Sequence, residues 1–192
     1  MVQNPYQNAL LPAPVGGGYS DPDYWIWCGS VVQGEDGAYH MFASRWPKDL
    51  GFGANWLFNC EIVRASSKNP EGPYTFQEVV LGRRGRTFFD GMNVHNPYIR
   101  KWNQTYYLYY MGTTFGGPIP GPGDEVDSSR FTEVWNRKRI GLATAPSVFG
   151  PWTRCDEPLI SPRDCSHWDC TATTNPAVAI QPDGTTYMLC KS

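Results

Sequence analysis

The chain has 192 residues, of which 41% are hydrophobic, 15% aromatic and 18% charged, and its formal net charge is −2. This composition is typical of a globular protein with a buried core and excludes a disordered or fibrous chain. The slight negative charge argues against nucleic acid or an anionic membrane as a partner, and no stretch of about 18 apolar residues predicts a membrane span.

The first 20 residues are expected to be an N-terminal extension ahead of the folded part. This segment lacks the basic and apolar regions of a signal peptide, so we expect a cytoplasmic protein. Secretion stays open if the sequence continues upstream.

A first repeat unit is expected over residues 24–81. A strand that follows Asp23 leads through a polar turn at residues 35–37 to a second strand that ends near Arg45. A third strand begins at residue 61 and a fourth covers residues 75–81. The pattern predicts four consecutive antiparallel strands joined by turns.

A second unit is expected over residues 91–160, after Asp90, with its fourth strand over residues 153–160. Residues 139–152 align without a gap on residues 61–74 and share an Ile, an Ala, a Gly-Pro pair and a final aromatic residue. A third unit follows Asp169 over residues 170–192 and reaches its second strand. The alignment of the three units makes Cys28, His95 and Thr174 equivalent, with an aspartate five residues ahead of each.

The repeat predicts an all-β fold of the β-propeller type, because four strands in each unit of tens of residues are typical of propeller blades. The chain supplies about two and a half four-stranded blades of a five-bladed ring. A closed ring needs at least about four blades, since an open arc exposes strand edges. We therefore expect either a missing C-terminal half or a homodimer of two half-rings, and no stable monomer of this chain alone.

Two longer loops, over residues 46–60 and 113–138, connect the second and third strands of the first two units. Their matching positions predict that both lie over the same face of the propeller. They are either functional loops or solvated insertions.

The three aspartates carry the candidate chemistry. The first strands of all blades line the central channel and run the same way, so Asp23, Asp90 and Asp169 are expected to meet at one rim. Neighbouring carboxylates have divergent pKa values, and one acid with one base is the equipment of glycoside hydrolysis. The alternative is that each Asp only caps a turn at the start of a strand.

Residues near these aspartates suggest a sugar site. Exposed tryptophan faces stack on sugar rings, whereas Trp27 is expected to pack in the core. Amides on the inner strands can bond sugar hydroxyls, and His95 either tunes a carboxylate or fills a polar core position. The candidate substrate-binding residues are Trp25, Arg45, His95, Asn96, Trp168 and Asn175.

Neither a metal nor a cofactor is expected. The cysteines show no CxxC spacing, so they are expected to be reduced thiols. Cys165, His167 and Cys170 could supply three zinc ligands, but their spacing matches no common zinc module and a fourth ligand is missing.

The segments HNPYIRKWNQTYYLYYMGTT, RIGLATAPSVFGPW and TTNPAVAIQPDG resemble those of the family 43-like five-bladed propeller glycoside hydrolases, which include arabinofuranosidases and xylosidases. The resemblance covers about residues 20–192. It implies an early-blade Asp as general base, matched by Asp23, and a later orienting Asp, matched by Asp90 or Asp169. The family's general acid is a Glu, and none occupies a comparable inner-strand position here. The acid then lies beyond Ser192, or Asp169 replaces it, or the activity is lost.

The expected function is cleavage of a glycosidic bond in a small glycoside or oligosaccharide by carboxylate acid/base catalysis. One alternative is a non-catalytic carbohydrate-binding or assembly propeller. Another is a propeller repurposed for non-hydrolytic small-molecule chemistry.

Overall fold

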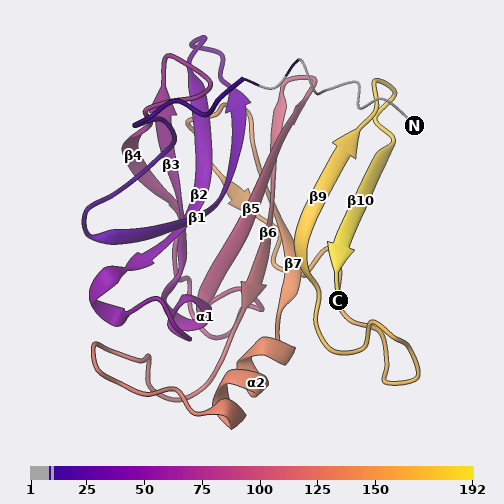
Figure 1. Ribbon diagram of the computed structural model, residues 1–192. Helices are drawn as coiled ribbons and strands as arrows, with labels where there is room; N and C mark the ends of the chain where they lie inside the picture. The colour runs from indigo at the N-terminus through magenta and orange to yellow at the C-terminus, as the bar shows by residue number, and fades with distance from the viewer. Residues whose placement is uncertain (1–8, 10) are drawn as a thin grey trace, which may run out of the picture.

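The computed structural model describes residues 9 and 11–192, and its strands form three antiparallel sheets (Figure 1). The first sheet has the order β1 (Tyr24–Gln33), β2 (Tyr39–Pro47), β3 (Glu61–Ser67) and β4 (Thr75–Leu81). The second has the order β5 (Asn93–Trp102), β6 (Thr105–Thr113), β7 (Arg139–Ala145) and β8 (Thr153–Arg154). The third pairs β9 (Thr174–Ile180) with β10 (Thr186–Lys191). These sheets confirm the all-β prediction of two four-stranded blades and half of a third.

The fourth strand of the second blade is shorter than predicted. The sequence predicted a strand over residues 153–160, whereas β8 has two residues and only Ile160 forms a further bridge, to Ile140. The intervening segment contains Pro158, which has no N–H to donate to a ladder. The chain bonds β7 as far as the Cys155 N–H, then leaves the sheet and returns to it at Leu159 and Ile160.

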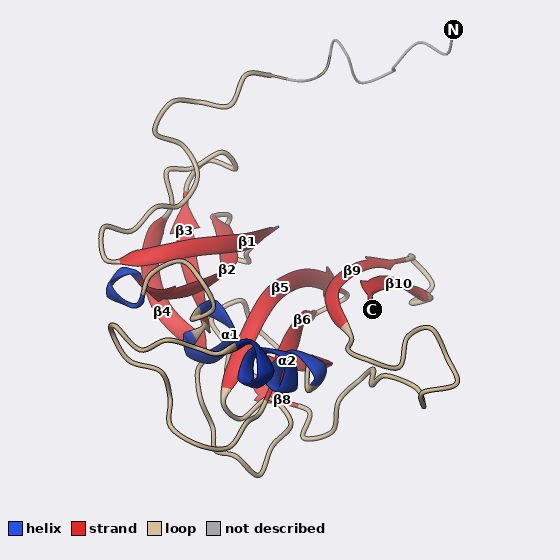
Figure 2. Cartoon of the chain, turned by 60° about the horizontal axis from the view of Figure 1, so that its bottom comes forward, coloured by secondary structure: helices blue, strands red, loops and turns tan. Residues whose placement is uncertain are grey.

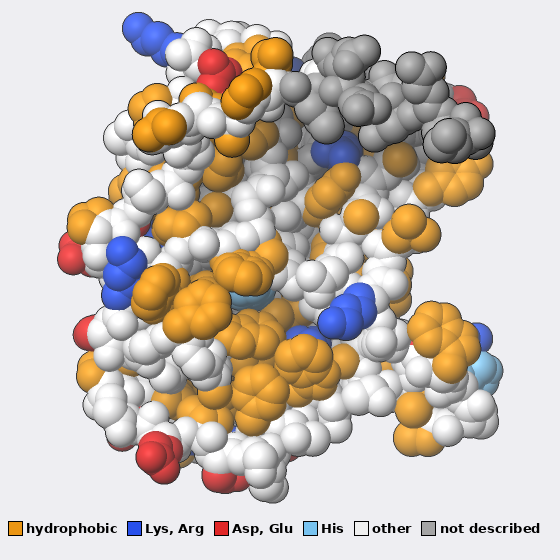
Figure 3. All heavy atoms as spheres, viewed as in Figure 1, with side chains coloured by type: hydrophobic (Ala, Val, Ile, Leu, Met, Phe, Trp, Pro, Cys, Tyr) orange, Lys and Arg blue, Asp and Glu red, His pale blue; other side chains and the backbone are white. Residues whose placement is uncertain are grey.

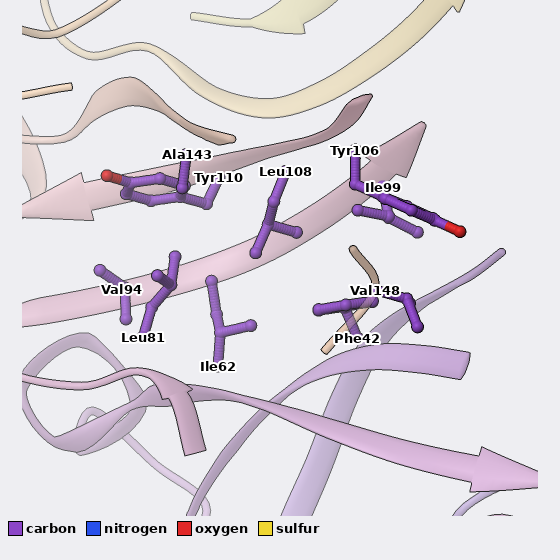
Figure 4. Packing of buried hydrophobic residues seen from close by; sticks show 10 residues of the cluster. All are labelled: Phe42, Ile62, Leu81, Val94, Ile99, Tyr106, Leu108, Tyr110, Ala143 and Val148. Atoms are coloured by element: carbon purple, nitrogen blue, oxygen red, sulfur yellow. The ribbon is translucent and has the colours of Figure 1, made fainter. Parts of the chain in front are cut away.

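The main core lies between the first two sheets (Figure 4). Phe42 and Ile62 of the first sheet and Leu108 and Tyr110 of the second are fully buried. Leu108 and Tyr110 lie two residues apart on β6, so their side chains point to the same face of the sheet. Each such side chain contributes roughly 1.5–3 kcal/mol to folding, so this contact fixes the first blade against the second.

A single carboxylate also joins these two blades. Glu35, in the turn between β1 and β2, accepts hydrogen bonds from the Tyr106 hydroxyl at 2.7 Å and from the Val148 N–H at 3.2 Å. The Ser147 hydroxyl donates to the same carboxylate. The turn of the first blade is thereby anchored to the second blade.

The two long loops contain the helices, and both loops lie over the same end of the strands (Figure 2), as predicted. They hold η1 (Lys48–Leu50), α1 (Trp56–Asn59) and α2 (Ser128–Asn136). The Asp127 carboxylate caps α2 by accepting from the Arg130 N–H at 2.9 Å. Leu57 and Phe58 pack with Phe115 and Val134 in a second cluster that joins the loops. No helix in the described part of the chain is long and apolar enough to cross a membrane.

Candidate functional site

A cavity of about 300 Å³ lies where the three sheets and the two helical loops meet. Its walls consist of aromatic rings, polar inner-strand side chains and two lysines: Trp27, Trp46, Phe52, Trp56, His95, Asn96, Trp135, Lys138, Thr174, Asn175 and Lys191. No Asp or Glu is among these residues. Figure 3 shows hydrophobic side chains gathered on this face beside Lys or Arg side chains, with acidic side chains around its margin. The candidate site is therefore apolar and basic.

The same backbone irregularity shapes all three inner strands at the cavity. Cys28, Asn96 and Asn175 have left-handed backbone conformations, with φ of 52°, 52° and 53°. The ladder shifts register at each of these positions. Such conformations are uncommon outside glycine, and a register shift redirects the neighbouring side chains. The residues just before them, Trp27, His95 and Thr174, line the cavity.

This irregularity corrects the alignment of the first unit by one residue. The sequence made Cys28 equivalent to His95, whereas the left-handed positions make Cys28 equivalent to Asn96 and Asn175. Counted from these positions, Asp90 and Asp169 remain equivalent, but Pro22 rather than Asp23 occupies the matching place in the first blade. The error arose because a bulge cannot be located from apolar periodicity alone.

His95 is the most buried polar side chain of the cavity's inner-strand wall, with 3% of its surface exposed. Its Nδ1 bonds the Asn96 carboxamide oxygen, so Nδ1 carries the proton and Nε2 is a hydrogen-bond acceptor. Nε2 is buried and has no partner among the described residues. Burial lowers the pKa of His95 from 6.5 to about 4, so the ring is neutral at pH 7.

Asn96 ties the three blades together beside His95. Its N–H donates to the Ser44 hydroxyl of β2 at 2.9 Å, and its side-chain amide donates to the Thr174 hydroxyl of β9 at 3.3 Å. The left-handed backbone of Asn96 permits both contacts at once. This residue therefore sets the position of the His95 ring.

Lys138 lies between α2 and β7 and is 1% exposed. Its ammonium nitrogen stands over the Trp135 ring, 2.9 Å from the centroid, and forms no ion pair with any described carboxylate. Burial, with a smaller repulsion from Lys191, lowers the pKa of Lys138 from 10.5 to about 7. The site thus holds a buried amine that is protonated below about pH 7 and has no anionic partner among the described residues.

The aromatic walls come from strands β1 and β2 and from the two long loops. Trp56 of α1 stands 5.0 Å from the His95 ring and 5.9 Å from the Trp135 ring, between centroids. Trp27 packs edge-on against Phe52 yet is 49% exposed. Trp27 was predicted to lie in the core, and this is wrong because the register shift places it at the cavity.

The three predicted catalytic aspartates do not line this cavity. Asp90 is fully buried, with its oxygens bound by Arg84 at 2.7 Å, the Tyr110 hydroxyl at 2.7 Å and Arg154 at 3.3 Å. Asp169 accepts two hydrogen bonds from Arg163, at 2.8 and 2.9 Å.

Asp23 is exposed and lines a separate surface hollow with Lys48 and Asp49. Among the described residues, the three carboxylates therefore share no ion-pair partner. Their catalytic roles stay predictions.

Of the predicted substrate-binding residues, the structure brings His95, Asn96 and Asn175 to the cavity and leaves three others outside its lining. Arg45 bonds Glu61 at 2.8 Å and stacks on Tyr24. Trp168 is 79% exposed on the loop before β9. Trp25 packs edge-on against Phe52, and Phe52 also packs against Trp27.

The sequence prediction did not include Phe52, Trp135, Lys138 or Lys191. A usable signal existed for Lys138. The ungapped alignment of the third strands, extended by one residue, places Lys138 opposite Cys60, which is buried. A lysine at a position that is buried in the other repeat is unusual, and this contrast could have identified Lys138 as a candidate site residue. No comparable signal marks Trp135, because its place depends on how the loop folds.

The described residues contain no group of three or more His, Cys, Asp or Glu side chains arranged to hold a metal ion. Cys165, His167 and Cys170 lie close in sequence but form no such group. The cavity presents aromatic, amide and basic side chains to a ligand.

No protein-family model matches the sequence, and no curated protein matches it. Solved structures do match. A family 117 glycoside hydrolase of the marine bacterium Zobellia galactanivorans is 21% identical with a TM-score of 0.64, over 88% of this chain and 48% of that one. The chain has the fold of the five-bladed propeller glycoside hydrolases.

Two further matches are a family 43 enzyme and an arabinanase. A family 43 β-xylosidase/α-arabinofuranosidase from a compost metagenome is 20% identical, over 87% of this chain and 42% of that one, with a TM-score of 0.55. An arabinanase of Bacillus subtilis is 18% identical, over 85% and 46%, with a TM-score of 0.52. The chain spans less than half the length of each of these three structures. The likeness shows the fold.

Proposed function

We propose that this glycoside hydrolase-like propeller chain binds a sugar ring in the cavity between its blades. The observation that carries the proposal is the lining itself, in which tryptophan rings surround inner-strand amides and the free Nε2 of His95. Sugar rings stack their C–H faces on aromatic rings, and their hydroxyls both donate and accept hydrogen bonds. The cavity volume of about 300 Å³ is at the small end of ligand sites, which suits one ring.

Hydrolysis of a glycosidic bond is the second candidate function. The likeness to solved glycoside hydrolases favours it. The chemistry needs two carboxyl groups on either side of the bond, roughly 5 to 10 Å apart. None lines the cavity, so catalysis requires Asp23, Asp90 or Asp169, or carboxylates outside this chain. Binding of sugar is therefore the function that this chain's own side chains support best.

The test measures sugar binding by isothermal titration calorimetry on the unmodified chain and on Trp27→Ala. Trp27 is half exposed, so its truncation removes a stacking surface without opening a hole in the core. Loss of one stacking face weakens binding roughly 3- to 10-fold. Trp168→Ala is the matched control, because Trp168 is exposed outside the cavity. Equal losses in both variants, or no binding to any sugar, would reject the proposal.

Hydrolysis is tested separately with aryl pentosides and with Asp23→Asn. Removal of a general base lowers the rate about 10²- to 10⁴-fold while binding is kept. Turnover that survives Asp23→Asn unchanged would limit Asp23 to a turn residue. Sugar binding without turnover would favour the non-catalytic function.

A further inference from the structure

We propose that the cavity selects an acidic sugar, whose carboxylate or sulfate group pairs with Lys138 and whose hydroxyl donates to Nε2 of His95. This inference rests on the proposed function, because it names the class of sugar for the same cavity. It requires one ligand to satisfy two buried groups of opposite hydrogen-bonding character.

Lys138 differs from the buried arginines of the described chain and from His40, each of which has a carboxylate partner. Arg45 is paired with Glu61 at 2.8 Å, Arg64 with Glu78 at 2.9 Å, and His40 with Asp36 at 3.1 Å. Lys138 is as buried as these residues and has no carboxylate partner.

A buried charge is costly unless it is paired, and a cation–π contact with one ring offsets only part of that cost. An anionic ligand would complete the site.

The surrounding charges point the same way. Lys191 of β10 also lines the cavity, and the lining contains no acidic residue to compete with an incoming anion. Repulsion from the Lys191 ammonium helps to lower the pKa of Lys138, so the positive potentials of the two lysines overlap. A negative group placed there is attracted by both lysines.

His95 specifies the second feature of the ligand. Its Nδ1 proton is used by Asn96, so the buried Nε2 can only accept a hydrogen bond. An ionised carboxylate or sulfate has no proton to donate, whereas a sugar hydroxyl does. A ligand that carries an anion and neighbouring hydroxyls, as a uronic acid or a sulfated sugar does, answers both requirements.

The experiment compares three probes on the full chain by isothermal titration calorimetry near pH 6. D-Galacturonate and D-galactose differ in a carboxylate, and galactose 6-sulfate carries the other anion on the same ring. A charge-assisted hydrogen bond predicts roughly 10- to 100-fold tighter binding of the preferred anionic sugar than of galactose. Lys138→Met is expected to remove this preference, whereas Lys138→Arg keeps it.

Lys101→Met is the matched control, because Lys101 is exposed over Tyr106 and lies outside the cavity. Circular dichroism verifies that each variant is folded. Preference for galacturonate assigns the anion as a carboxylate, and preference for the sulfate assigns it as a sulfate ester; both support the proposal. Equal binding of galactose and both anionic sugars would overturn it while leaving the proposed function intact. Absence of binding for every sugar would overturn both.

Discussion

Lys138 stands in the second blade where Cys60 stands in the first. Each immediately precedes the third strand of its blade, and each carbonyl accepts from an N–H at or just before the start of the next blade's inner strand. The distances are 3.5 Å from the Val94 N–H to Cys60 and 3.2 Å from the Thr173 N–H to Lys138. A neutral thiol serves in one blade, so the fold itself does not require a charge at this position. The ammonium of Lys138 is therefore a feature of the site.

Binding of galacturonate is expected to weaken as pH rises above about 7. Burial and the nearby Lys191 hold the pKa of free Lys138 at about 7, so the cation is lost above that pH. His95 is neutral across this range, since its pKa is about 4.

Affinity should therefore be nearly constant below pH 7 and fall by up to about tenfold per pH unit above it. Lys138→Arg should keep its affinity to pH 9, because guanidinium stays charged. Calorimetry between pH 6 and 9 measures both, and a parallel decline in Lys138→Arg would contradict the assignment.

Asn96→Ala is expected to destabilise the protein more than Asn96→Gly. Both changes remove the side-chain bonds to His95 and Thr174, but only alanine is strained at φ 52°. The left-handed conformation costs a residue with a Cβ roughly 1–2 kcal/mol relative to glycine. Urea denaturation of the two variants measures this difference. If alanine proves as stable as glycine, the bulge does not hold the conformation described.

Asp90→Asn is expected to lower the free energy of unfolding by about 3 kcal/mol or more. It leaves Arg84 and Arg154, which are 18% and 12% exposed, without their buried anion. Asp169→Asn should change it by less than about 1 kcal/mol, because Arg163 is half exposed. Chemical denaturation distinguishes the two. Similar small effects would show that Asp90 is free for another role.

Glu35 should contribute stability at neutral pH that disappears in acid. Partial burial would raise its pKa, but hydrogen bonds from Ser147, Tyr106 and the Val148 N–H outweigh this and lower the pKa from 4.5 to about 2. A lowered folded-state pKa stabilises above the unfolded value, so the contribution is lost as pH falls from about 4.5 towards 2.

Glu35→Gln should cost no more than about 1 kcal/mol at pH 7, because the carboxylate is largely exposed and screened. The cost should shrink at pH 3, as measured by urea denaturation. Glu71→Gln, at an exposed glutamate in another turn, is the control. A cost that is the same at both pH values would show that charge is not involved.

The repeat predicted the fold because blade strands carry a regular apolar pattern, and the segment around Ile62 aligns with that around Ile140 without a gap. It placed His95, Asn96 and Asn175 at the inner strands, and the structure brings them to one cavity. In the first blade the left-handed position is Cys28, one residue away from where the alignment put it, and this leaves Asp23 out of step with Asp90 and Asp169.

The remaining wall could not be derived from periodicity. Trp135 and Phe52 come from loops whose fold depends on tertiary packing, and the pairing of Asp90 with Arg154, 64 residues further along the chain, left no local signature. Sequence spacing predicted which residues share a strand position. It did not predict which of them would be neutralised by a partner.

The most direct test of a sugar site in this cavity is a ¹⁵N–¹H spectrum of the tryptophan indoles during titration with galacturonate and galactose. Saturable shifts are expected for the indole signals of Trp27 and Trp56, which line the cavity, and an unchanged signal for Trp168, which does not. Substitution of each tryptophan by phenylalanine assigns the signals. Saturable shifts confined to Trp168, or no shift with either sugar at concentrations far above a millimolar dissociation constant, would contradict the account.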